Sequence, residues 1–245
     1  MEVHAHTHTP RKKWTHYFWE FFMLFLAVTL GFFVENQREH YIEGKREKVY
    51  LEGILQDLKG DTANFSSFLI RNNENYKRFD SLIQEIKTIN SSTNTNRLYY
   101  LARTVWGKTE RLQYIRRTYD QLKSSGSLRL IHKKNVLDSI SRYFESLQWM
   151  DLQNELLIER QTLYAVELGE IFDSWTIDSI FNTDFSLPQS TPPLITTNRQ
   201  QLNKYVAHIH LVKGVYNYNL KKISTEYLPA ARRLIEVLKV GYDLK

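Results

Sequence analysis

The segment of residues 14–34, WTHYFWEFFMLFLAVTLGFFV, places the strongest constraint on how this chain folds. No charged residue occurs from Phe21 to Val34. As an α-helix the segment extends roughly 30 Å, which is the thickness of the hydrocarbon core of a bilayer. Aromatic residues typical of the membrane–water interface stand at its start: Trp14, Tyr17, Phe18 and Trp19. The segment therefore predicts a transmembrane helix.

Two other interpretations of this segment are disfavoured. A cleaved signal peptide also has a basic start and an apolar run, but it ends in small residues. This run ends in Phe32-Phe33-Val34-Glu35-Asn36, without such a cleavage site. A buried helix of a soluble protein is shorter and less aromatic. We predict an uncleaved, single-pass anchor.

The charges that flank the segment predict its orientation. Arg11, Lys12 and Lys13 precede it, whereas residues 35–43 are mixed and mildly acidic. Because positive charge is retained on the cytoplasmic side, the amino terminus is expected in the cytoplasm and the remainder across the membrane. The predicted parts are a cytoplasmic, His-rich basic leader (1–13), the transmembrane helix (14–34), a charged helical stalk (35–50) and an extracytoplasmic helical domain (51–245). For a bacterial chain this means the inner membrane and the periplasm.

One face of the predicted span carries small and ionisable residues. At 100° per residue, Glu20, Ala27, Gly31 and Glu35 fall on one stripe, which we call the span stripe. Small residues four apart let two helices approach closely. One interpretation is a helix–helix interface in which Glu20 faces protein or water. In the other, Glu20 pairs with His16 one turn earlier and reaches the headgroups; both interpretations stay open.

His4, His6 and His8 alternate at the amino terminus and are the candidate metal ligands. Alternating imidazoles in an extended segment can share zinc, copper or nickel. However, a structural zinc site takes four ligands, and His16 is the only other histidine nearby. A polar leader that binds metal only adventitiously is favoured, and no cofactor is predicted.

Beyond the span, apolar residues recur at alternating steps of three and four, with Thr62 and Asn72 filling two places. The apolar members are Leu51, Leu55, Leu58, Phe65, Leu69, Tyr76, Phe79, Ile83 and Ile86. This heptad pattern predicts one helix that continues from the span to Ile89. The polar run 90–96 then ends it.

Three further helices are expected. The second begins at Arg97, breaks at Gly107 and resumes from Thr109 to Lys123. The third covers 133–180, with a second apolar face at Leu152, Leu156 and Leu163 that suits a central helix or contact with another subunit. The fourth covers 198–240 and is disturbed by Pro229. The predicted class is all-α: a single transmembrane helix continuing into an antiparallel four-helix-bundle or coiled-coil domain.

Composition and motifs argue against several functions. The absence of Cys excludes disulfides, thiolate metal sites and Cys nucleophiles. The 33 Lys and Arg are interspersed with 27 Asp and Glu, so the net charge of +6 is better explained by a solvated helical surface than by nucleic-acid binding. No HExxH, glycine-rich phosphate loop or G-x-S-x-G motif occurs. We therefore expect a protein that is not an enzyme.

Two stretches of the sequence match a known pattern. The first contains the alternating histidines of the amino terminus, Glu20, Phe25-Leu26-Ala27-Val28, Gly31-Phe32 and Glu35-x-x-Arg38-Glu39; the second is Tyr119-Asp120-Gln121-Leu122-Lys123-Ser124-Ser125-Gly126 with Leu130-Ile131. Together they resemble a family of uncharacterised single-pass membrane proteins from Bacteroidota. The chain departs from the family pattern at Val34, where a small residue is expected. The resemblance implies a bacterial inner-membrane protein with a periplasmic helical domain, and it implies no activity.

The sequence favours a non-enzymatic, membrane-anchored interaction or scaffold subunit that self-associates or joins other membrane subunits. One alternative is a periplasmic sensor module that signals through a partner. Another is an accessory subunit of an ion-driven membrane machine that uses Glu20. The expected partners are the lipid bilayer and either copies of this chain or other membrane proteins, with no nucleic acid.

Overall fold

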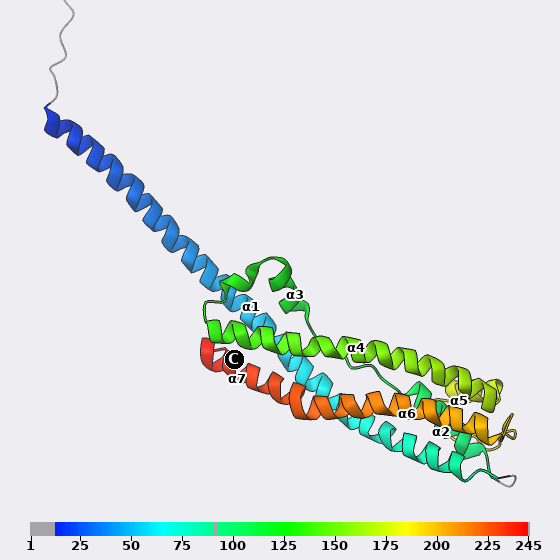
Figure 1. Cartoon of the computed structure of the whole chain (residues 1–245). Coiled ribbons are helices and arrows are strands. Elements are labelled where there is room, and N and C mark those ends of the chain that lie inside the picture. The colour runs from blue at the N-terminus through cyan, green and yellow to red at the C-terminus, as the bar shows by residue number, and fades with distance from the viewer. Residues whose placement is uncertain (1–12, 91–92, 245) are drawn as a thin grey trace, which may run out of the picture. The chain divides into compact units, whose positions relative to one another are not determined.

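The computed structural model describes residues 13–90 and 93–244 of the chain (Figure 1). Those residues form helices, turns and loops without any β-strand, which confirms the predicted all-α class. The chain divides into two units between Val49 and Tyr50. The second unit, which we call the helical domain, contains two hydrophobic clusters.

Helix α1 spans Trp14–Lys87, so the helix does continue from the apolar segment into the helical domain, and it ends two residues before the predicted end at Ile89. The later elements are α2 (Asn96–Gly107), α3 (Arg117–Ser124), a 3-10 turn (Ser127–Leu130), α4 (Lys134–Ile171), α5 (Ser174–Asn182), α6 (Arg199–Lys222), a π-helical turn (Ile223–Tyr227) and α7 (Leu228–Tyr242).

Successive segments of the helical domain run in alternating directions. Asp57 bonds to Thr118 and Glu85 pairs with Arg97, so the chain from α2 to α3 runs opposite to α1. Helix α4 packs on α6 and α7, and Figure 1 shows these helices beside the same part of α1. The helices therefore enclose a core that α1 lines from Leu51 to Ile86.

The buried face of α1 is wider than the predicted heptad seam. Its fully buried side chains include seam positions such as Leu58 and Phe79, and also Ile54, Phe68 and Leu82 outside the seam. A two-helix seam buries only a narrow stripe, whereas a helix contacted from several sides buries a broad one. The width of the face thus follows from α1 packing against the other helices of the domain.

The second expected helix is interrupted over residues 108–116, which we call the linking segment, so the prediction of helix from Thr109 was wrong. The Leu112 N–H donates to Asn154 Oδ1 at 3.2 Å, and Asn154 Nδ2 donates to the Leu112 carbonyl at 2.8 Å. The Ile115 N–H donates to Asp61 Oδ1 at 2.7 Å. Side chains of α1 and α4 thus form hydrogen bonds with backbone groups that would bond to one another in a helix.

The third expected helix also ends early, at Ile171 rather than Ile180. Phe172 is extended, with φ −111° and ψ 143°, and its ring is buried in the core. Asp173 then caps a new helix, α5, because its carboxylate accepts from the Thr176 N–H at 2.8 Å. The cap redirects the chain where the helical periodicity alone predicted continuation.

Pro229 has the effect expected of it. Proline lacks the N–H that would bond to the carbonyl four residues earlier. The chain adjusts through the π-helical turn Ile223–Tyr227, where the Leu228 N–H bonds to the Ile223 carbonyl. The fourth expected helix is therefore α6 and α7 joined by this turn.

Asn154 is expected to be important for stability because it bonds to both backbone groups of Leu112. Replacing Asn154 by Ala should lower the free energy of unfolding by about 2 kcal/mol, since two hydrogen bonds are lost from a half-buried site. The measurement is denaturant unfolding of the full chain in detergent, followed by far-UV circular dichroism. The control Gln148→Ala changes an exposed residue of α4 and should cost less than about 0.5 kcal/mol. Equal losses in the two variants would contradict this role.

Candidate functional site

The span stripe is exposed in the structure. The four residues Glu20, Ala27, Gly31 and Glu35 lie on the first half of α1, and all are exposed. A Cβ placed on Gly31 would meet no other atom within 4 Å. The apolar window of α1 is long enough to cross a membrane, and none of it is buried within the chain. This face therefore offers a surface on which a lipid chain or another helix can pack.

The ionisable residues near the stripe form short-range pairs along α1. His16 Nε2 lies 3.0 Å from Glu20 Oε1, with both side chains about half exposed. Arg38 Nη2 lies 2.6 Å from Glu35 Oε1, and this hydrogen bond lowers the pKa of the Glu35 carboxyl. The structure thus brings together the His16–Glu20 pair named from sequence, and it joins Glu35 to Arg38.

The candidate metal ligands His4, His6 and His8 lie outside the described residues. Within residues 13–90 and 93–244, no group of three or more His, Asp or Glu side chains is placed to hold a metal ion.

Two buried carboxylates of α1 hold the linking segment and the start of α3. Asp57 accepts from the Thr118 N–H at 2.9 Å and from Arg117 Nη2 at 3.1 Å. Asp61 accepts from the Ile115 N–H and from the Tyr143 hydroxyl, both at 2.7 Å. Burial raises the pKa of Asp61 to about 6, although both hydrogen bonds favour its ionised form. These contacts indicate that Asp57 and Asp61 stabilise the fold rather than take part in a reaction.

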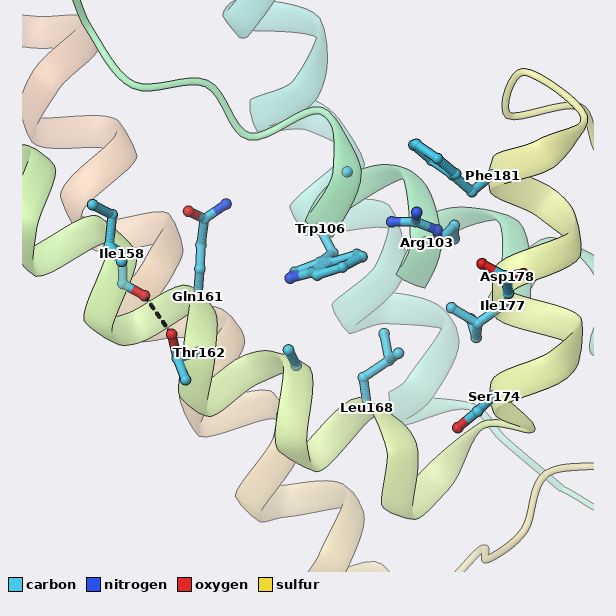
Figure 2. A pocket seen from close by; sticks show the side chains of 12 residues that line it. Arg103, Trp106, Ile158, Gln161, Thr162, Leu168, Ser174, Ile177, Asp178 and Phe181 are labelled. Atoms are coloured by element: carbon cyan, nitrogen blue, oxygen red, sulfur yellow. Dashed lines mark hydrogen bonds between the residues drawn. The ribbon is translucent and has the colours of Figure 1, made fainter.

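A cavity of about 810 Å³ lies between α2, α4 and α5 (Figure 2). We call it the Arg103 cavity. Its walls are Arg103, Trp106, Gly107, Ile158, Gln161, Thr162, Ala165, Leu168, Ser174, Ile177, Asp178 and Phe181. Six of these twelve residues have apolar side chains and five have polar or charged ones, so the lining is mixed.

Arg103 lies beside this cavity, and only 5% of its surface is exposed. Its guanidinium carbon lies 4.4 Å from the ring centre of Trp106, 4.5 Å from that of Phe181 and 5.4 Å from that of Phe185. Its Nε and Nη1 atoms are buried without a hydrogen-bond partner. Burial lowers the pKa of Arg103, and the nearby Asp178 opposes that shift. Arginine nevertheless stays charged, because its ordinary pKa is far above neutral.

Sequence reasoning missed Arg103, although a signal for it was present. Tyr99, Ala102, Arg103 and Trp106 follow the spacing of one helix face, and Tyr99 and Ala102 on that face are completely buried. A charged residue on an otherwise apolar, inward face is unusual enough to deserve notice. Asp57 and Asp61 had no comparable local signal, because their partners are distant in sequence.

No known protein family, characterised protein or solved structure matches this chain. The resemblance to the Bacteroidota family therefore stays a prediction.

The raised pKa of Asp61 predicts an unusual pH dependence of stability. Because the folded-state pKa of about 6 exceeds the ordinary 3.8, the folded protein binds this proton more tightly, and the contribution of Asp61 to stability is lost as pH rises through 6. Each pKa unit corresponds to about 1.4 kcal/mol. Asp61→Asn keeps an acceptor for the Ile115 N–H, so its stability relative to wild type should improve by roughly 2.4 kcal/mol between pH 4 and pH 7.

The measurement is the difference in unfolding free energy between variant and wild type at several pH values. Asp138→Asn, at an exposed position of α4, is the control and should show no such trend. A difference that stays constant with pH for Asp61→Asn would contradict the raised pKa.

Proposed function

We propose that this chain is a single-pass membrane protein in which residues 14–34 cross the bacterial inner membrane. Residues 1–13 would lie in the cytoplasm, and the helical domain would form a periplasmic bundle. The length of the apolar window, its aromatic start and the basic residues before it support this placement. Its large apolar side chains, such as Phe21 and Phe32, are exposed rather than packed in the core of the chain.

The function that we propose is that of a non-enzymatic interaction or scaffold subunit that associates with further copies of itself. The observation that carries this proposal is the open face around Gly31, where a Cβ would contact nothing. In a bilayer, the association of helices is stabilised by close packing at small residues rather than by the removal of apolar surface from water. Ala27 and Gly31 supply a small-residue pair at the spacing that such packing requires.

A second exposed stripe, on α4, supports the same proposal. Trp149, Leu152, Leu163 and Val166 are exposed and Leu156 is half-buried, although α4 already buries its opposite face in the core. Their positions follow steps of three, four, seven and three, which is a heptad register. A second copy of α4 presents the same register and is a suitable partner for it.

Gly31→Ile tests self-association through the span. The larger side chain should keep two helices apart and weaken association by roughly tenfold, a loss of about 1.4 kcal/mol. The open surroundings of Gly31 mean that the substitution leaves the fold of the single chain intact. The measurement is the molecular mass of the protein in a mild detergent, as a function of concentration, by sedimentation equilibrium.

Gly44→Ile is the matched control. Gly44 also lies on α1 with no atom within 4 Å of an added Cβ, but it stands outside residues 14–34. The control should associate like wild type. An unchanged mass for Gly31→Ile, or an equal effect of both substitutions, would contradict the proposed interface.

A further inference from the structure

We propose that the Arg103 cavity is a binding site for an organic monocarboxylate with an apolar body, whose carboxylate pairs with the Arg103 guanidinium. This inference goes beyond the interaction function, which does not require a small-molecule ligand.

Arg103 stands out because its Nε and Nη1 atoms are buried without a hydrogen-bond partner, and only the nearby Asp178 and the surrounding rings offset its charge. Other buried charged groups have partners: Asp57 pairs with Arg117, Glu167 pairs with Lys204, and Asp61 accepts two hydrogen bonds. Among the described residues, neither Nε nor Nη1 of Arg103 has a carboxylate or any other hydrogen-bond partner. A buried charge without a partner is costly, so an anion that entered the cavity would gain a strong interaction.

The aromatic rings around Arg103 hold the guanidinium in place for such a ligand. Trp106 and Phe181 lie within 4.5 Å of the guanidinium carbon, which favours stacking over the faces of the planar group. Stacking leaves the edges, where the N–H groups are, available for hydrogen bonds. A guanidinium fixed in this way loses little further entropy when it binds an anion.

The backbone of Asp184 and Phe185 brings a third aromatic ring close to Arg103. Asp184 and Phe185 have φ angles of +54° and +59°, a conformation that is rare for a bulky residue such as Phe. It places the Phe185 ring against Gly107, where an added Cβ would lie only 2.5 Å from Phe185 Cε1 and 3.0 Å from Arg103 Nη1. Only glycine at position 107 lets the Phe185 ring and the Arg103 guanidinium lie this close to the backbone of residue 107.

The other polar groups favour a single negative charge. Asp178 lines the same cavity with an exposed carboxylate, which would repel a second charge on the ligand. Thr162 already donates its hydroxyl proton to the Ile158 carbonyl at 3.0 Å. Gln161, Ser174 and the indole N–H of Trp106 are the remaining side-chain donors of the lining. One arginine and these neutral donors suit a carboxylate better than a phosphate dianion.

The walls favour an apolar ligand body. Leu168 and Ile177 are buried, and with Ala165 and Ile158 they contribute aliphatic surface to the cavity. The volume of about 810 Å³ lies in the range that holds drug-sized ligands. Figure 2 shows Leu168 of α4 and Ile177 of α5 on the side of the cavity that faces α2, which carries Arg103 and Trp106.

The test measures binding of 4-phenylbutyrate to the full chain in detergent, by calorimetry and by the rise in melting temperature. Its neutral amide, 4-phenylbutanamide, and the dianion phenyl phosphate serve as comparison probes. Wild type should bind 4-phenylbutyrate with a dissociation constant in the millimolar range or below, and both other probes more weakly. No binding at concentrations on the order of 10 mM, equal binding of the amide, or tighter binding of phenyl phosphate would overturn the proposal.

Arg103→Met is the decisive variant because it keeps most of the side-chain length and removes the charge. It should weaken binding of 4-phenylbutyrate at least about tenfold, since a charge-assisted hydrogen bond is lost. Its melting temperature without ligand should equal or exceed that of wild type, because an uncompensated buried charge is removed. Arg129→Met, at an exposed arginine, is the control and should bind like wild type.

Ala165→Phe provides a second variant that leaves Arg103 in place and fills the cavity from the α4 wall. It should also abolish binding of 4-phenylbutyrate. Wild-type affinity in either cavity variant would overturn the proposal. A lower melting temperature of Arg103→Met together with unchanged binding would show that the guanidinium only supports the fold.

Discussion

The helical domain depends on how the linking segment satisfies its backbone. Residues 109–115 of this segment lie outside the helices, and a buried N–H without a partner is costly. Asp61, Asn75 and Asn154 supply bonds to Ile115, Lys108 and Leu112. Three side chains from two helices thus supply four hydrogen bonds to the backbone of a segment that is not helical.

These contacts also set the positions of α2 and α3. Asp57 holds the first turn of α3, and Asn75 holds the residue that follows α2. Because α2 is fixed at its end, Arg103 and Trp106 face α4 and α5 and form one wall of the cavity. The side chains that bind the linking segment therefore also determine where Arg103 lies.

Much of this fold could be predicted from the sequence, because helical periodicity is local. Steps of three and four identified α1, the greater part of α4, and α6 with α7, and Pro229 marked the π-helical turn. The failures occur where distant partners compete with local preference. Asp61 is 54 residues from Ile115, and Asn154 is 42 residues from Leu112, so no window of sequence contains both members of either pair. The Arg103 cavity was not predicted from the sequence for the same reason, because its walls come from three separate helices.

Hydrogen–deuterium exchange of the full chain tests most directly whether the linking segment is held by side chains. The amides of Leu112 and Ile115 should exchange slowly, like those within α3, although the segment is not helical. The amides of Leu187, Gln189 and Ser190, in the loop before α6, should exchange fast and provide the internal reference. Exchange at Leu112 and Ile115 as fast as in that loop would contradict the account.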